Sequence, residues 1–153
     1  MGTTNHEYYV SLEVAKLLKE AGFDWKCREY YHNFTTTGWS LSFDDNFINW
    51  QQEGDNYLSA PTLDVAQRWL REVKNISVEA KSFRWVNRYQ DDKYTVTYRH
   101  ELWPIDTSII PSEEDKFIRY TLDCACDIEF QTYEQALEAG IKKCLTLLLE
   151  EKK

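Results

Sequence analysis

Apolar residues along this chain repeat at two different intervals, and this limits the possible folds more than any other feature. Three segments, 11–21, 61–74 and 132–149, place them at the 3.6-residue spacing of a helix. Two other segments, 76–85 and 94–102, alternate apolar and polar residues as strands do. These patterns predict an α+β fold, in which a small antiparallel sheet of three to five strands packs against about three helices.

Residues that suit helix ends flank the three helical segments. Ser11 is a good N-cap, Gly22 fits the left-handed residue after a helix, and Pro61 suits a first turn. Thr132 and Gln135 have the spacing of a capping box. The helical stripes predict nearly complete burial of four side chains: Leu70, Leu137, Ile141 and Leu145.

The two alternating segments are predicted to pair as a hairpin. Within the first of them the apolar residues change parity, which predicts a β-bulge at Lys81–Ser82. A third alternating run, Tyr120–Phe130, predicts another strand. On that strand Cys124 and Cys126 would face the core, where cysteine packs as a small apolar residue.

The segment 23–57 is rich in aromatic residues and is less regular than the rest of the chain. Short strands are predicted at Trp25–Tyr31 and Gly38–Phe43, with turns at Asp44–Asn46 and Glu53–Asn56. The sequence leaves open whether this aromatic segment is core or binding surface.

Length and charge limit the class of protein. The 153 residues are predicted to form one domain, 1–153, large enough to fold without a metal or a disulfide. No apolar run reaches the ~20 residues of a membrane helix, and residues 1–10 lack a signal-peptide pattern. We therefore expect a cytoplasmic protein with free thiols and no membrane partner. A net charge of −8 disfavours nucleic acid, although residues 61–100 carry eight basic and five acidic groups.

Three motifs occur in a characteristic order and spacing. They are the run Val10–Phe23, the run Ser59–Thr62 leading to Trp69–Val73, and the run Thr132–Ile141. In this order they resemble a family of small uncharacterised proteins found in phage and prophage gene sets of gut-type bacteria. The resemblance implies a phage or prophage context, and it supplies no catalytic or binding residue.

Candidate catalytic and metal-binding groups have simpler structural readings. The Cys124–Cys126 pair lacks the second cysteine pair of a structural zinc site. Cys27 and His32 could act as a nucleophile and its base, but no oxyanion hole can be placed beside them. His100 lies on an apolar strand face, as a hydrogen-bonded core histidine would, and the acids Asp44–Asp45 suit a turn. We expect a non-enzymatic protein with no catalytic residue, metal or cofactor.

The most distinctive surface candidate mixes cations with aromatic rings over residues 68–99. Its predicted binding residues are Arg68, Arg71, Arg84, Trp85, Arg88 and Lys93. Arg and Trp are enriched at protein hot spots, whereas single-strand nucleic-acid binders place cations beside stackable rings. A solvated sheet face, on which long side chains cover rings, is the plain alternative. The leading prediction is a protein-interaction module that binds an unidentified host or phage protein. A nucleic-acid accessory protein is the alternative, and the oligomeric state stays open.

Overall fold

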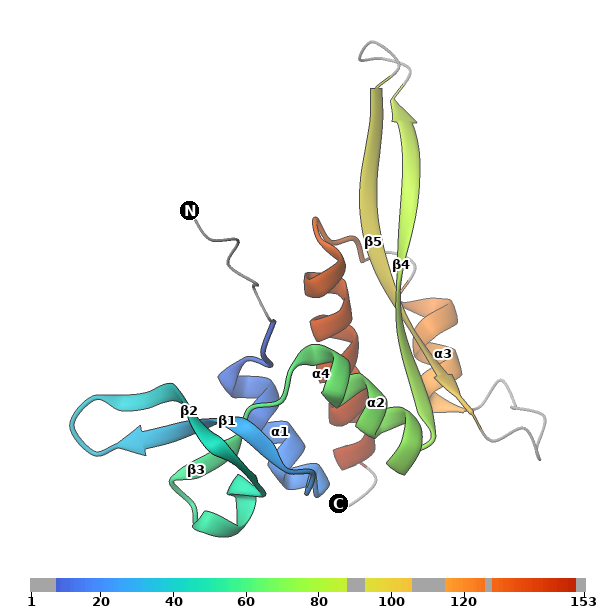
Figure 1. The fold of residues 1–153 in the computed structure, drawn as a ribbon. Coiled ribbons are helices and arrows are strands. Elements are labelled where there is room, and N and C mark those ends of the chain that lie inside the picture. The colour runs from blue at the N-terminus through green and yellow to red at the C-terminus, as the bar shows by residue number, and fades with distance from the viewer. Residues whose placement is uncertain (1–7, 88–92, 106–114, 126–127, 151–153) are drawn as a thin grey trace. The chain divides into compact units, whose positions relative to one another are not determined.

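The computed structural model of the chain describes residues 8–87, 93–105, 115–125 and 128–150, with the side chains of 85–87 and 93–94 left out (Figure 1). These residues form four α-helices, one short 3-10 helix and two antiparallel sheets of three and two strands. The predicted α+β class is confirmed, with the strands divided between two sheets where we expected one. The chain divides into two compact units, 1–69 and 70–153, each with its own sheet.

The first unit opens with helix α1, Leu12–Ala21, as predicted. The side chain of Ser11 caps this helix by accepting a hydrogen bond from the N–H of Val14 at 3.3 Å. Gly22 follows with a φ of 93°, the left-handed conformation in which glycine ends a helix at little cost. The buried side of the helix carries small and branched apolar residues: Val14, Ala15, Leu18 and Ala21.

Three antiparallel strands form the sheet of this unit. Strand β1 (Cys27–Phe34) lies between β2 (Gly38–Ile48) and β3 (Tyr57–Ser59) (Figure 1). The short helix η1, Trp50–Glu53, lies between β2 and β3 in the sequence. The two predicted strands of the aromatic segment are thus present, and β2 runs several residues beyond the end that we predicted for it.

A β-bulge of several residues interrupts the pairing of β1 with β2. The strands pair regularly from Phe34↔Gly38 back to Glu29↔Phe43, and the next pair is Cys27↔Ile48. Residues 44–47 of β2 therefore lie opposite Arg28 alone. The predicted turn at Asp44–Asn46 is wrong, because these residues belong to β2. A bulge departs from regular strand backbone much as a turn does, which explains why its residue types resemble those of a turn.

The two faces of the three-stranded sheet have different surroundings. On one face the hydroxyl of Tyr31 donates to the carbonyl of Val10 at 2.8 Å, Leu58 is buried, and α1 packs against β3. The opposite face carries a row of aromatic rings from β1, β3 and η1. The sheet therefore has one face toward α1 and one aromatic face.

Helix α2, Leu63–Val73, crosses the boundary between the two units. In the first unit its residue Trp69 is buried and meets Phe23 edge to face, with ring centres 5.3 Å apart. In the second unit Leu70 is fully buried, as predicted, whereas Val73, one turn farther along the helix, is 46% exposed.

Strands β4 (Ile76–Asn87) and β5 (Lys93–Pro104) form the predicted hairpin of the second unit. They pair residue by residue along their whole length, so the predicted bulge at Lys81–Ser82 is wrong. The change of parity has another cause. Phe83 lies on the face away from the core, where the guanidinium of Arg99 is 4.6 Å from the centre of its ring.

Helix α3, Lys116–Asp123, occupies a segment in which we predicted the start of a strand. The carboxylate of Asp115 caps this helix by accepting hydrogen bonds from the N–H groups of Phe117 and Ile118 at 2.9 and 3.1 Å. Phe117, Ile118 and Thr121 are buried, at helical spacing. The predicted strand over Tyr120–Phe130 is therefore wrong.

Helix α3 also changes where Cys124 lies, one of the two cysteines that we predicted to face the core. Cys124 follows directly after α3 and is exposed, so its predicted place in the core is wrong. Cys126 lies outside the described residues. Among the described residues of this unit, Cys144 on helix α4 packs in the core.

Helix α4, Tyr133–Glu150, packs against both strands of the hairpin. Its start is capped as predicted, because Thr132 Oγ1 accepts a hydrogen bond from the N–H of Gln135 at 3.1 Å. Three residues of its buried stripe, Leu137, Ile141 and Leu145, are at most 1% exposed, which confirms their predicted burial. Across the described part of the chain, no helix is both long and apolar enough to span a membrane.

Candidate functional site

Arg28 contacts the β-bulge of β2. Its Nε donates to the carbonyl oxygen of Asp44 at 3.4 Å, and its Nη2 lies 3.6 Å from the carboxylate of Asp45. Its guanidinium also lies 5.8 Å from the centre of the Phe47 ring. One side chain thus contacts the bulge at three places, and the last contact positions an aromatic ring that is 61% exposed.

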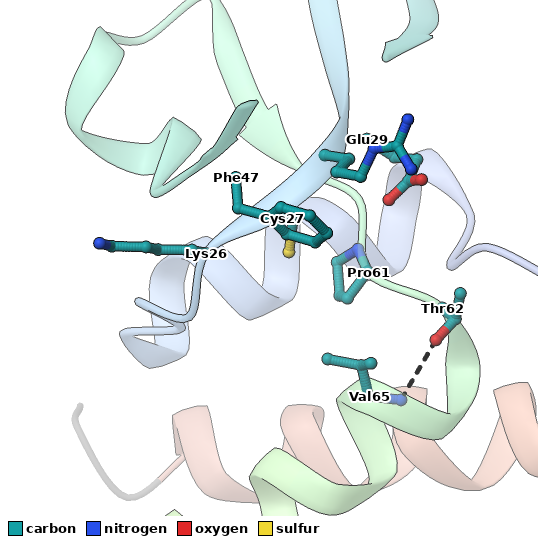
Figure 2. Close-up of a pocket in the computed structure, with 8 residues that line it drawn as sticks. Lys26, Cys27, Glu29, Phe47, Pro61, Thr62 and Val65 are labelled. Carbon is teal, nitrogen blue, oxygen red and sulfur yellow. Dashed lines mark hydrogen bonds between the residues drawn. The ribbon is translucent and has the colours of Figure 1, made fainter. Parts of the chain in front are cut away.

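A pocket of about 240 Å³ lies beside this ring (Figure 2). It is formed by the start of β1, the end of β2 and the start of α2. Its apolar lining is Cys27, Phe47, Pro61 and Val65, and its polar lining is Lys26, Arg28, Glu29 and Thr62. Figure 2 shows the Phe47 ring beside the sulfur of Cys27, with Pro61 and Val65 across the opening and the Lys26 ammonium pointing away. We call this the Phe47 pocket.

Three of the four polar residues that line the Phe47 pocket have partners within the chain. Glu29 accepts a hydrogen bond from the hydroxyl of Tyr9 at 3.3 Å, and Arg28 is engaged by the bulge. The hydroxyl of Thr62 accepts the N–H of Val65 at 3.4 Å (Figure 2). Among the apolar side chains, Phe47 is 61% exposed, Val65 is half-buried, and Cys27 and Pro61 are buried. The pocket thus offers an apolar surface beside an exposed ring, which suits an apolar group.

The buried thiol in this pocket is not a nucleophile at neutral pH. Burial and the nearby Glu29 carboxylate raise the pKa of Cys27 to about 12, so the thiol keeps its proton. Cys27 and His32, which we considered as a catalytic pair, lie five residues apart on one extended strand, roughly 16 Å from each other. The structure does not bring them together.

Further apolar side chains are exposed near the pocket on the same hairpin. Phe43 is 76% exposed and Leu41 is 45% exposed. Phe43 pairs with Glu29 across the strands, and Glu29 lines the pocket, so the exposed stripe and the pocket adjoin. Leu41 and Phe43 lie two residues apart on one face of β2, and neighbouring exposed apolar residues of this kind are typical of interaction sites.

The aromatic face of the sheet offers less to a ligand than its composition predicts. His32 stacks on Tyr57 with ring centres 4.6 Å apart, and Tyr30 stacks on Trp50 at 3.8 Å. Phe34 meets His32 edge to face at 4.2 Å. Because these rings turn their faces toward one another, few faces remain for a nucleic-acid base to stack on. The aromatic segment is thus partly core, as at the buried Trp50, and partly exposed surface.

The structure describes the side chains of three of the six predicted binding residues of the 68–99 surface: Arg68, Arg71 and Arg84. Arg68 and Arg71 lie three residues apart on α2, and the guanidinium of Arg68 is 4.9 Å from the ring centre of Trp25. Arg84 is exposed on β4. The side chains of Trp85 and Lys93 are not among those described, and Arg88 lies outside the described residues.

Two other cations of this surface are neutralised by carboxylates. Lys81 Nζ lies 2.6 Å from Glu101 and 3.8 Å from Glu79, and Arg99 Nη2 lies 2.9 Å from Glu129. Lys81 and Arg99 are cross-strand partners on one face of the hairpin, whereas Arg84 pairs with Val96 on the other face. This arrangement resembles a solvated sheet face more than a phosphate-binding surface.

His100, which is buried, pairs with the half-buried Tyr120 in the second unit. The Nε2 atom of His100 hydrogen-bonds the hydroxyl of Tyr120, and the two rings stack with centres 5.6 Å apart. Burial lowers the pKa of His100 and raises the pKa of Tyr120, so both groups are neutral at pH 7. The predicted hydrogen-bonded core histidine is confirmed. Within the described residues, no group of three or more His, Cys, Asp and Glu side chains could hold a metal ion.

Comparison with known proteins adds no relative. Neither the protein-family models, nor the curated proteins, nor the solved structures give a match to this chain. The resemblance to the phage-associated family stays a prediction.

Sequence reasoning did not find the Phe47 pocket. Its lining comes from three segments, 26–29, 47 and 61–65, that no short motif connects. One local signal was present in Phe47 itself, a large apolar residue directly after the polar run Asp44–Asn46. An apolar residue beside turn-like residues is a candidate for exposure.

Proposed function

We propose that this chain is a non-enzymatic protein-interaction module that acts in the cytoplasm, and that its partner protein inserts one apolar side chain into the Phe47 pocket. The observation that carries the proposal is the combination of an apolar lining with a small volume of about 240 Å³. Pockets for small-molecule ligands usually measure about 300–1,000 Å³. A smaller pocket suits a single side chain that anchors a larger interface.

The surroundings of the pocket support the same function. Interface hot spots combine aromatic and arginine side chains in a central position, and Arg28, whose guanidinium lies 5.8 Å from the Phe47 ring centre, supplies both with Phe47. A phage or prophage origin belongs to this proposal as well, and its support is the resemblance of the three sequence motifs.

A selection from a random peptide library, with the full chain as bait, tests this function. We expect the enriched peptides to share one large apolar residue, and replacement of that residue by alanine to abolish binding. Phe47→Ala removes a wall of the pocket from an exposed position, so the fold should survive. It should weaken peptide binding about tenfold or more, the range of a hot-spot truncation.

Phe43→Ala is the matched control for this experiment. Phe43 lies on the same strand and is more exposed than Phe47, but it does not line the pocket. We expect peptide affinity to change less than about twofold in this variant. Peptides that bind both variants and the unmodified chain equally would place the partner elsewhere and overturn the proposal.

A further inference from the structure

Strand β2 is an outer strand of its sheet, and its first six residues leave one edge open. The strand order is β2-β1-β3, so no described strand pairs with the outer edge of residues 38–43 (Figure 1). Soluble proteins usually protect such edges with lysine, proline, an inward charge or a bulge. The run Gly38-Trp39-Ser40-Leu41-Ser42-Phe43 contains no charge and no proline, and the bulge begins only after it.

Three apolar side chains of this edge lie on one face. Trp39, Leu41 and Phe43 alternate with Ser40 and Ser42, and their face is the one that α1 covers elsewhere on the sheet. Lys16 of α1 lies 5.7 Å from the Trp39 ring centre, which marks the near end of this stripe. Leu41 and Phe43 farther along are 45% and 76% exposed. The open edge and the exposed stripe thus coincide on the same six residues.

We propose that this edge pairs with the same edge of a second copy of the chain, antiparallel and centred on Leu41. In an antiparallel pair, two directly opposed residues either both point their N–H and C=O groups toward the partner strand or both point them away. The register can therefore change only in steps of two residues. Three registers therefore deserve comparison, centred on Ser40, on Leu41 or on Ser42.

The register centred on Leu41 pairs each of the three apolar residues with an apolar residue of the second copy. It sets Leu41 against Leu41 of the second copy and Trp39 against Phe43, in both directions. Aromatic and aliphatic pairs of this kind stabilise adjacent strands. Centring on Ser42 sets Trp39 against Asp45 of the second copy, and centring on Ser40 leaves Phe43 against Thr37. The sequence of the edge is self-complementary in one register only.

The charges at the end of the edge agree with this register. Asp44, the first bulge residue, would lie opposite Gly38 of the second copy, which has no side chain. The acids of the two copies therefore stay at opposite ends of the shared ladder. The bulge also ends the flat stretch there, which limits the interface to residues 38–44. Each copy carries a net charge of −8, so salt should strengthen an association of this kind.

Sedimentation of the full chain over a range of micromolar concentrations tests the proposal. We expect the mass to rise with concentration from 18.3 kDa toward twice that value, and to rise further when salt is added. Leu41→Lys should hold the protein at the monomer mass, because it sets two like charges against each other at the centre of the interface. Since Leu41 is half exposed, circular dichroism should show an unchanged fold.

A charge-swap pair tests the register itself. Leu41→Lys and Leu41→Glu should each be monomeric alone, and an equal mixture should recover the dimer, because residue 41 of one copy faces residue 41 of the other. Wild-type protein that stays monomeric overturns the proposal, and so does a mixture that stays monomeric. Phe47→Ala should leave the mass unchanged, so the dimer and the peptide-binding function can each fail without the other.

Discussion

The hydroxyl of Thr121 bonds to both backbone groups of Leu102: it donates to the carbonyl oxygen at 2.8 Å and accepts from the N–H at 2.9 Å. A neighbouring strand would normally pair with these two groups. Four residues earlier on the same strand, Tyr98 exchanges backbone hydrogen bonds with Phe130 at 2.9 and 2.8 Å. In the described residues, the outer edge of β5 is thus covered by a helix side chain at Leu102 and by the bridge to Phe130 at Tyr98.

Thr121→Val should destabilise the second unit although it keeps the size and shape of the side chain. The buried N–H and C=O of Leu102 would both lose their partner, at about 1–3 kcal/mol for each unsatisfied group. Urea denaturation measures the loss. Thr146→Val is the control, because its hydroxyl bonds only to the Lys142 carbonyl on an exposed helix face, and its effect should stay within about 0.5 kcal/mol. Equal effects of the two changes would contradict the assigned role of Thr121.

Gly140→Ala should also destabilise the protein, against the usual preference of helices for alanine. A Cβ atom at this position would lie 2.9 Å from the side chains of both Val78 and His100. Overpacking of this kind costs about 1–3 kcal/mol. The double variant Gly140→Ala with Val78→Ala should lose less stability than the sum of the two single losses, because the second change opens space for the added methyl group. Additive losses in thermal or urea unfolding would show that α4 is not held this close to the sheet.

The helices α1, α2 and α4 could be predicted because each carries its own signals. Ser11 and Thr132 cap their helices with short-range hydrogen bonds, and stripes such as Leu137 and Ile141 recur at helical spacing. Such signals depend only on residues close in the sequence. The hairpin of β4 and β5 is equally local, because its strands follow one another directly.

Helix α3 could not be predicted because the burial of Thr121 depends on a distant strand. In the sequence Thr121 counts as polar, which left Tyr120 and Leu122 as neighbours in an apparent two-residue alternation. In the structure Thr121 is 6% exposed and Leu122 is 56% exposed. The bonds to Leu102 make this hydroxyl a buried group, and no pattern within residues 116–130 reveals them. The Phe47 pocket escaped prediction for the same reason, since three distant segments form it.

Stability should fall as the pH drops below about 6.5, the ordinary pKa of histidine, because burial lowers the pKa of His100 in the folded protein. In this range the unfolded chain binds a proton that the folded chain does not, so acid favours unfolding. Above about pH 6.5 the contribution of neutral His100 to stability is fully present. The loss of stability is complete once the pH falls below the lowered pKa of His100 in the folded protein. Urea denaturation on either side of the window should show a smaller pH dependence for His100→Gln than for the wild type. The same dependence in both proteins would remove His100 as its cause.

Labelled single- and double-stranded DNA and RNA should not bind the chain tightly at physiological salt of ~0.15 M. The cations Lys81 and Arg99 are paired with carboxylates, and the net charge of −8 repels polyanions. Fluorescence titration at low and moderate salt is the measurement. Micromolar binding that disappears when Arg84 and Arg88 are changed to glutamate would favour the nucleic-acid alternative.

The most direct test of the proposed function is to map, by NMR amide shifts, where a library-selected peptide binds the labelled full chain. We expect the largest amide shift changes at the pocket-lining residues that carry an N–H: 26–29, 47, 62 and 65. These changes should be lost in Phe47→Ala and kept in Phe43→Ala. Shift changes centred on Lys81, Arg84 and Arg99, with the pocket residues unaffected, would contradict it.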